Sequence, residues 1–326
     1  MVTLISICIP TLNRCGYLCK ALNSVFQADI DKSLFEICIS NNASDHDYSA
    51  AIQLIASMSE DFKICYIEQP TRLSIDEHMM AVKNLASSPY VYFLGDDDFF
   101  IYGQLPLLVN LINDKSPDLA IFNGILVNKD DKVIGSHFKL PPRIYVDISQ
   151  AFWDLRDKGM FGAVLVKRKH LIDENFKRLF GTAHGYGCYW FSLFSSDSRS
   201  NPPVILIPEF PLVSLRMAEK NYNLLEVYYR DIPYELAVYQ RYLNPGLPQL
   251  LNLRFKSKYF DRISSLSFLA HMFALGVNIS ELEFINPGLY KKNVIKIHVA
   301  KVFVLSGAYR LMRRIYKFQF GKGLNT

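Results

Sequence analysis

The stretch Tyr90-Val-Tyr-Phe-Leu-Gly-Asp-Asp-Asp-Phe-Phe100 decides the fold, because it joins an apolar run directly to three consecutive carboxylates. An apolar run without polar alternation is typical of a strand that helices cover on both faces, as in a parallel sheet. Three adjacent carboxylates repel one another and cannot all be ionised in a dry core without a partner. We therefore predict that they lie at the open end of this strand and face a cation.

The carboxylates of this stretch suit a hard divalent cation. Mg²⁺ and Mn²⁺ prefer carboxylate oxygens and share their remaining positions with substrate phosphates. Open α/β sheets bind ligands beyond the carboxyl ends of their strands. The stretch thus predicts a metal–diphosphate site with Asp97 and Asp98 as metal ligands. The alternative is a solvated acidic turn in which Asp97 or Asp98 caps a following helix.

The composition fits a large folded protein of the reducing cytoplasm. The chain has 326 residues, of which 50% are hydrophobic and 21% are charged, enough for one large domain or two fused ones. Its six cysteines form no Cys-x-x-Cys pair and follow no secretory leader, so we expect free thiols. No apolar window is long enough to predict a membrane-spanning helix.

Charge is distributed unevenly along the chain. Residues 1–125 hold 7 Lys and Arg against 15 Asp and Glu, whereas residues 126–326 hold 29 against 16. The acidic part can hold a metal, and the basic part can meet an anionic surface.

Apolar runs alternate with helical patterns through the first third of the chain. The segment beginning at Ser74 has the Ser-x-x-Glu form of a capping box and predicts a helix start. Four strand–helix alternations predict a mostly parallel, doubly wound α/β sheet. The predicted strands are residues 4–9, 35–40, 62–67, 90–94 and 118–122.

The pattern changes after Gly124. Residues 125–128 and 132–134 flank a polar turn and predict a hairpin, and from about residue 215 the chain reads as helical. We therefore expect three parts. They are an acidic nucleotide-type half at 1–125, a mixed segment at 126–214, and a basic helical region at 215–326.

No glycine-rich phosphate loop follows the first strand. Phosphate charge would instead be met by the metal and by Arg14 and Arg72, which both follow predicted strands. For each arginine the alternative is a surface ion pair with a neighbouring carboxylate.

Three segments resemble family-2 glycosyltransferases of the GT-A fold. They are Ile7-Cys-Ile-Pro-Thr-Leu-Asn-Arg14, Ile37-Cys-Ile-Ser-Asn-Asn-Ala-Ser-Asp45 and Phe93-Leu-Gly-Asp-Asp-Asp98. The second of them and Arg72-Leu-Ser-Ile-Asp76 are most similar to the abequosyltransferase branch that builds bacterial O-antigens. The resemblance covers about residues 4–125.

The resemblance implies a Rossmann-like GT-A fold with helices on both faces of the sheet, here followed by a C-terminal helical region. It also implies a nucleotide-diphospho-sugar donor, Mg²⁺ or Mn²⁺ on Asp97 and Asp98, and transfer to a hydroxyl of a growing glycan. The residues expected to bind the donor, including the two arginines, are Pro10, Thr11, Asn13, Arg14, Asn41, Asn42, Arg72, Asp76, Asp96 and Asp97.

Asn41 departs from the family pattern and bears on the base of the donor. Many members carry Asp at this place, where it accepts the N3–H of uracil. An Asn amide offers both a donor and an acceptor, so it can pair with cytosine or flip to serve uracil. Both CDP- and UDP-linked donors stay open, as does the alternative that Asn41 only caps the next helix.

The general base is predicted from the region after residue 170. The family usually supplies it from an acidic pair, which residues 180–190 lack. His184 is the main candidate, and the nearest carboxylates are Asp173 and Glu174. The alternative is a surface loop histidine, and without a base a retaining reaction stays open.

The C-terminal region predicts membrane contact. Residues 291–326 hold nine Lys or Arg and no acidic residue. Basic residues at 310, 313, 314 and 317 share one helical face, and apolar residues at 308, 311, 312 and 315 share another. This pattern indicates a helix lying on an anionic membrane surface, and the alternative is a helix docked on its own domain. No nucleic-acid-binding module is present.

Together these features predict a cytoplasmic, peripherally membrane-associated glycosyltransferase of the inverting type. It would transfer a sugar to a lipid-linked oligosaccharide in bacterial surface polysaccharide synthesis. The alternatives are a sugar nucleotidyltransferase, which would normally open with a glycine-rich loop, and a non-catalytic glycan- or partner-binding scaffold.

Overall fold

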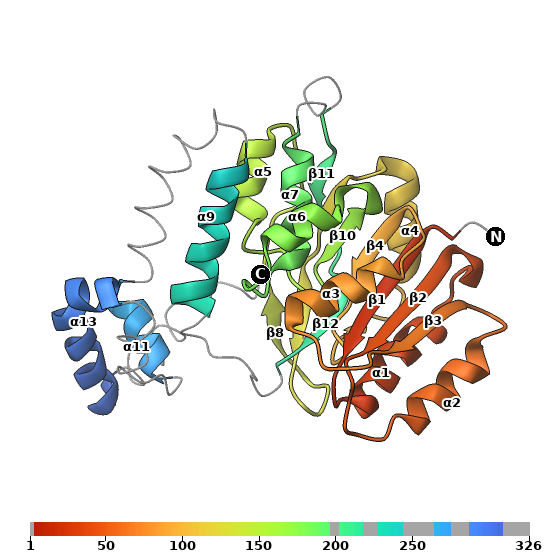
Figure 1. Cartoon of the computed structure of the whole chain (residues 1–326), viewed down its shortest axis with the longest axis horizontal. Helices are drawn as coiled ribbons and strands as arrows, with labels where there is room; N and C mark the ends of the chain where they lie inside the picture. The colour runs from red at the N-terminus through yellow and green to blue at the C-terminus, as the bar shows by residue number, and fades with distance from the viewer. Residues whose placement is uncertain (1–2, 196–201, 218–226, 244–263, 275–286, 309–326) are drawn as a thin grey trace, which may run out of the picture. The chain divides into compact units, whose positions relative to one another are not determined.

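Strands and helices alternate along the first part of the chain as predicted (Figure 1). The main sheet has eight strands in the order β3-β2-β1-β4-β10-β6-β11-β9. The chain divides into two units, Met1–Lys220 and Asn221–Thr326. The computed structural model describes residues 3–195, 202–217, 227–243, 264–274 and 287–308.

Most neighbouring strands of this sheet are parallel, which confirms the predicted α/β fold. The first four strands in the order pair in parallel, while β10 runs antiparallel between β4 and β6. Strand β10 was not predicted from the sequence, because a segment of four residues is too short to give a periodic signal. The strands are β1 Ile5–Thr11, β2 Phe35–Asn41, β3 Lys63–Glu68, β4 Tyr90–Phe93, β6 Leu119–Ile121, β9 Arg143–Tyr145, β10 Val164–Lys167 and β11 Ile205–Ile207.

A second, four-stranded sheet follows the carboxylate stretch, with the order β5-β12-β7-β8. It contains the predicted hairpin, since β7 and β8 pair antiparallel. Its strands are β5 Phe99–Phe100, β7 Gly124–Val127, β8 Val133–His137 and β12 Val213–Arg216. Because β5 follows Asp98 directly and the next helix begins at Leu105 with Gln104 as its N-cap, the alternative that Asp97 or Asp98 caps a helix is wrong.

Helices cover the sheet and bury its central strands. Helix α1 packs beside α2, and α3 packs on β1 and β2, so that β1 and β2 are buried almost throughout. Ser74 and Glu77 form the predicted capping box at the start of α3. The helices of this unit are α1 Cys15–Phe26, α2 Ser49–Met58, α3 Ile75–Asn84, α4 Leu105–Lys115, α5 Ile148–Leu155, α6 Asp173–Arg178 and α7 Tyr189–Leu193, with short turns η1 Lys32–Leu34, η2 Arg168–His170 and η3 Gly185–Cys188.

The second unit is helical where it is described. It contains the π-helix η5 Val227–Asp231 and the α-helices α9 Ile232–Tyr242, α11 Leu266–Ala274 and α13 Pro287–Leu305. Helices α11 and α13 pack together through a small apolar cluster that includes Leu269 and Ile297. The predicted basic face at residues 310–317 lies outside the described residues. No helix in the described part of the chain is long and apolar enough to cross a membrane. The predicted three-part division stays a prediction.

Candidate active site

The three carboxylates lie in a tight turn after β4, at the carboxyl edge of the sheet. The turn is closed by a hydrogen bond from the amide of Asp98 to the carbonyl of Gly95 (3.1 Å). Asp96 and Asp98 are each only 5% exposed, whereas the Asp97 side chain keeps 17% of its surface exposed. The outer two carboxylates therefore face the protein, and the middle one borders solvent.

Asp96 fastens the turn to the loop that follows β1. Its Oδ2 accepts hydrogen bonds from Thr11 Oγ1 (2.9 Å) and the amide of Leu12 (3.4 Å). Arg14 Nη1 lies 3.2 Å from Asp96 Oδ1 and 2.9 Å from Asp97 Oδ2. Burial raises the pKa of Asp96 to about 6, against the lowering effect of Arg14. Arg14 thus lies at the carboxylate edge as predicted, and two carboxylates share its guanidinium.

Asp98 is held from the other side by Arg216, a contact that was not predicted from the sequence. The amide of Arg216 donates to Asp98 Oδ1 (2.9 Å), and its Nε donates to the carbonyl of Asp97 (3.1 Å). Burial, together with the charges of Asp97 and Asp96, raises the pKa of Asp98 to about 8. The sequence signal was an arginine that ends the apolar strand Val213–Arg216, opposite a motif 118 residues away.

The Arg216 guanidinium also binds the tip of the β7–β8 hairpin. Its Nη1 donates to the carbonyls of Asn128 (3.0 Å) and Lys129 (3.2 Å), and its Nη2 forms an ion pair with Asp131. The side chain has no exposed surface. This one residue therefore joins the carboxylate turn, strand β12 and the hairpin.

One oxygen of each metal-site candidate is left for a ligand. Asp97 Oδ2 binds Arg14 and Asp98 Oδ1 binds the amide of Arg216, while no described residue hydrogen-bonds the other oxygen of either carboxylate. A Cβ on Gly95 would lie 2.6 Å from Asp98 Oδ2 and 3.3 Å from Asp97 Oδ1. Both oxygens therefore lie close to Gly95, where a side chain would have to displace them.

The two oxygens suit a metal ion that is shared with a substrate. Among the described residues, no group of three or more His, Cys, Asp or Glu side chains is arranged to hold a metal ion. Two carboxylate oxygens leave most coordination positions to a diphosphate and water, as Mg²⁺ prefers. The oxygen donors at Asp97 and Asp98 therefore fit the predicted Mg²⁺ or Mn²⁺.

We expect Gly95→Ala to weaken Mn²⁺ binding about tenfold or more, because the added methyl group must displace the buried Asp98 carboxylate. Isothermal titration calorimetry with Mn²⁺ in the presence of a nucleoside diphosphate measures the effect. The matched control is Gly16→Ala, whose methyl group meets no atom within 4 Å. Equal Mn²⁺ affinity in Gly95→Ala and wild type would show that the ion does not bind beside Gly95.

The polar turn after β2 lies against the β1 loop. Asn13, with φ of 57°, accepts a hydrogen bond from the amide of Asp45 (2.8 Å), and its own amide donates to Ser44 (2.9 Å). Asn42 binds both the amide and the carbonyl of Leu73. Both asparagines therefore shape the loops around the carboxylate edge, with Pro10 half-buried at the end of β1.

Asn41 is 2% exposed, and both ends of its amide are engaged within the protein. Its Nδ2 donates to Tyr66 Oη (3.1 Å), and its Oδ1 accepts from the amide of Ser44 (3.1 Å). The next helix starts at Ser49 without a side-chain cap, so the predicted capping role is wrong. Pairing with a donor base would require this amide to exchange partners.

Arg72 lies at the exposed rim of the same edge. Its Nη2 forms an ion pair of 2.7 Å with Asp45, and the two side chains are 50% and 75% exposed. This is the surface ion pair that was the alternative to phosphate binding, and such pairs contribute little to stability.

Asp76 binds protein where donor contact was predicted. It is 1% exposed, and its carboxylate accepts the amides of Gly181 (2.8 Å), Ala183 (3.1 Å) and Gly185 (2.9 Å). These residues surround His184, which is half-buried. The structure therefore shows Asp76 as the anchor of the His184 loop, because backbone donors engage both of its oxygens.

Asp173 and Glu174 lie at the start of α6, which packs on the short turn η3 that directly follows His184. Asp173 pairs with Lys83 in the last turn of α3, whereas Asp76 lies in the first turn. The rise of a helix places these two ends roughly 10 Å apart. Glu174 is exposed in the first turn of α6. The role of each of the three residues as a base stays a prediction.

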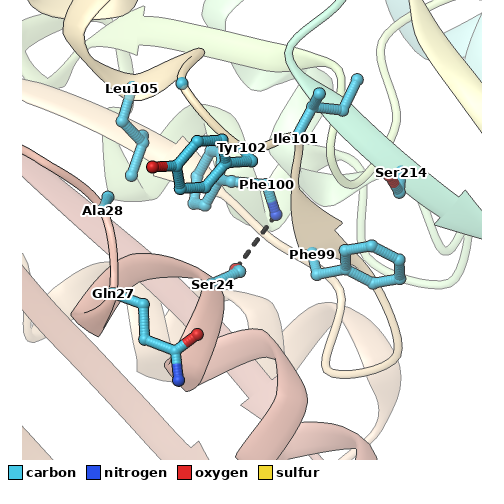
Figure 2. A pocket seen from close by; sticks show the side chains of 10 residues that line it. Ser24, Gln27, Ala28, Phe99, Phe100, Ile101, Tyr102, Leu105 and Ser214 are labelled. Carbon is cyan, nitrogen blue, oxygen red and sulfur yellow. Dashed lines mark hydrogen bonds between the residues drawn. The ribbon is translucent and has the colours of Figure 1, made fainter.

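A separate hollow of about 300 Å³ lies beside β5. Figure 2 shows Ser24 facing the backbone nitrogen of Phe100, which donates to its hydroxyl (3.0 Å). No lining residue is charged, so the hollow does not suit a diphosphate. It is lined by Ser24, Gln27, Ala28, Phe99, Phe100, Ile101, Tyr102, Gly103, Leu105 and Ser214.

Comparison with known proteins identifies similar sequences and folds. The model of Glycosyl transferase family 2 matches residues 6–190. Abequosyltransferase RfbV of Salmonella typhimurium is 33% identical over 113 residues, which are 35% of this chain and 34% of that protein. The match thus spans about a third of the relative's length.

Solved structures of S. aureus TarS residues 1–349 share the fold. The complex with UDP has a TM-score of 0.58 at 15% identity, and the complex with UDP-GlcNAc has 0.58 at 14%. Each alignment covers 94% of this chain and 92% of TarS 1–349. At this identity the likeness concerns the fold, and it confirms the predicted GT-A architecture.

Proposed function

Because the chain belongs to glycosyl transferase family 2, we propose that it transfers a sugar from a nucleoside diphosphate to a hydroxyl group of a glycan, assisted by a divalent metal ion. The observation that carries this proposal is the pair of carboxylates beside Gly95, where Asp97 and Asp98 each have one oxygen that no described residue hydrogen-bonds. Arg14 lies against the same carboxylates and offers positive charge to a diphosphate.

The residues of the site divide the chemistry between them. When bound at Asp97 and Asp98, the metal ion neutralises the diphosphate and acts as a Lewis acid on its oxygens. His184 accepts the proton of the acceptor hydroxyl while that oxygen bonds to the anomeric carbon of the sugar. The bond from this carbon to the diphosphate breaks, and attack on the face opposite the leaving group inverts the carbon.

The donor base is proposed to be a pyrimidine. Asn41, in place of the Asp that many family members carry, leaves a CDP-linked sugar open, and the TarS complexes with UDP and UDP-GlcNAc support a UDP-linked one. Asn41 lies at the end of β2 and can serve either base only after releasing Tyr66 or Ser44.

The acceptor is proposed to be a lipid-linked oligosaccharide of the O-antigen type. The similarity to abequosyltransferase RfbV supports this class of glycan. The basic C-terminal region, without an acidic residue after position 290, supports peripheral contact with the cytoplasmic face of an anionic membrane.

Nucleotide binding tests the proposal. We expect CDP or UDP, at about a hundred times Kd, to raise the melting temperature by roughly 5 °C with Mn²⁺ and by much less without it. GDP and dTDP serve as comparisons. Absence of any Mn²⁺-dependent shift would refute the metal–diphosphate site.

The alternative function is that of a non-catalytic binding scaffold, which is supported by the missing acidic pair near His184. Release of nucleoside diphosphate from CDP- and UDP-linked sugars distinguishes the two, because a scaffold binds the donor without cleaving it. The sugar nucleotidyltransferase reading loses its support, since the chain belongs to a glycosyltransferase family.

A further inference from the structure

Three backbone amides of one loop converge on a single buried carboxylate. Asp76 Oδ2 accepts the amides of Gly181 and Ala183, and Asp76 Oδ1 accepts the amide of Gly185. Hydrogen bonds to an ionised acceptor are stronger than neutral ones. The first turn of α3, where Asp76 lies, also favours negative charge through the helix dipole.

The loop is shaped to present these amides. Gly181 and Ala183 both have positive φ, 86° and 59° respectively. A Cβ on Gly185 would lie 2.4 Å from the Phe176 ring and 3.1 Å from Asp76 Oδ1. A left-handed alanine is strained, so the loop needs a compensating interaction, and Asp76 provides it.

The same loop holds His184 near the carboxylate edge. The His184 ring lies 6.2 Å from the Tyr186 ring, which lies 6.3 Å from Phe93 and 5.6 Å from Phe161. Phe93 is the last residue of β4, and Leu94 and Gly95 separate it from the three carboxylates. The ring of Tyr186 thus connects His184 to the strand that carries the metal-site candidates.

We propose that Asp76 is a positioning residue for His184, acting through the three loop amides rather than through the donor. The inference rests on the proposed function, in which His184 accepts the acceptor proton. Asp76 fixes where the imidazole stands relative to the sugar, and its loss leaves donor and metal binding intact.

The test begins with Asp76→Asn, which keeps the size of the side chain but turns one acceptor oxygen into an amide donor. Hydrogen–deuterium exchange of residues 180–186 should speed up, because at least one loop amide loses its acceptor. The kcat for nucleoside diphosphate release should fall about a hundredfold at unchanged KM for the donor, as expected for a displaced base.

The matched control is Glu77→Gln, one residue further along the same helix turn. Glu77 is exposed and makes the capping box with Ser74, so this variant weakens the start of α3 without touching the loop. It should leave loop exchange and kcat unchanged.

A double-mutant cycle with His184→Gln separates positioning from general damage. If Asp76 acts through His184, adding Asp76→Asn to His184→Gln should lower kcat no further. Additive losses, an increased KM for the donor, or unchanged kcat despite faster loop exchange would each overturn the inference. If wild type releases no nucleoside diphosphate from any donor, the proposed function fails and the positioning role fails with it. Unchanged loop exchange in Asp76→Asn would refute the anchor by itself.

Discussion

Asp98→Asn should lower sugar transfer about a thousandfold and yet raise the melting temperature of the metal-free protein at pH 8.5. The activity loss follows because the variant presents an amide where a hard cation needs a carboxylate oxygen. The gain in stability follows from burial, which raises the pKa of Asp98 to about 8. Ionising this group in the folded protein is therefore unfavourable.

The sign of the pH effect is fixed by comparing the folded and unfolded chains. The unfolded chain releases the Asp98 proton near its ordinary pKa of 3.8, and the folded chain near 8. Between these values the folded state binds more protons, so wild type loses stability as pH rises from about 4 to about 8. Asparagine does not ionise, and the variant lacks this loss.

Thermal unfolding between pH 4.5 and pH 8.5 measures the difference. The melting temperatures of wild type and Asp98→Asn should lie within a few degrees of each other at pH 4.5 and differ by roughly 10 °C or more at pH 8.5. Mn²⁺ should stabilise wild type and leave the variant unchanged. Asp61→Asn is the control, because this exposed carboxylate pairs with Lys32 at the surface and its loss should raise the melting temperature at neither pH. Normal sugar transfer by Asp98→Asn would show that Asp98 is not a ligand of the metal ion.

Arg216→Met should destabilise the protein by about 3 kcal/mol, because it removes a buried cation and leaves backbone acceptors unpaired. The carbonyls of Asp97, Asn128 and Lys129 lose their donor. For a unit of this size the melting temperature should fall by roughly 6–12 °C. Transfer should fall further than stability alone explains, since the Asp97–Asp98 turn loses its support.

Lys20→Met provides the control for Arg216→Met. Lys20 is the other cation bound to Asp131, at 2.8 Å, and its side chain is 51% exposed. An exposed ion pair contributes up to about 1 kcal/mol, so the melting temperature should change by only a few degrees. If the two variants had the same melting temperature, Arg216 would contribute no more to stability than an exposed ion pair, and it would not be the support of the carboxylate turn.

The sequence predicted the parts of the site that have a local signal. The apolar run before Asp96 indicated a buried strand, and Ser74 with Glu77 indicated the start of α3; both are present. Arg14 was placed correctly because residues that follow parallel strands meet at one edge of the sheet.

The rest depends on contacts between distant parts of the chain. Arg216 meets Asp98 across 118 residues, and Asp76 meets Gly181 across 105. Nothing near Asp76 in the sequence distinguishes a carboxylate that binds a loop from one that binds a ligand. The four residues of β10 likewise gave no sign that they would insert antiparallel beside β4.

Helix α3 binds the segment at residues 171–185 at two points. Its first turn binds the loop at residues 181–185 through Asp76, and its last turn binds Asp173 and the carbonyl of Leu171 through Lys83. The segment between these two contacts has to span a fixed distance, so the number of its residues is under stronger constraint than their identity. A new acceptor preference in this segment would evolve by exchange of side chains, because an inserted or deleted residue would break the contact of either Asp76 or Lys83.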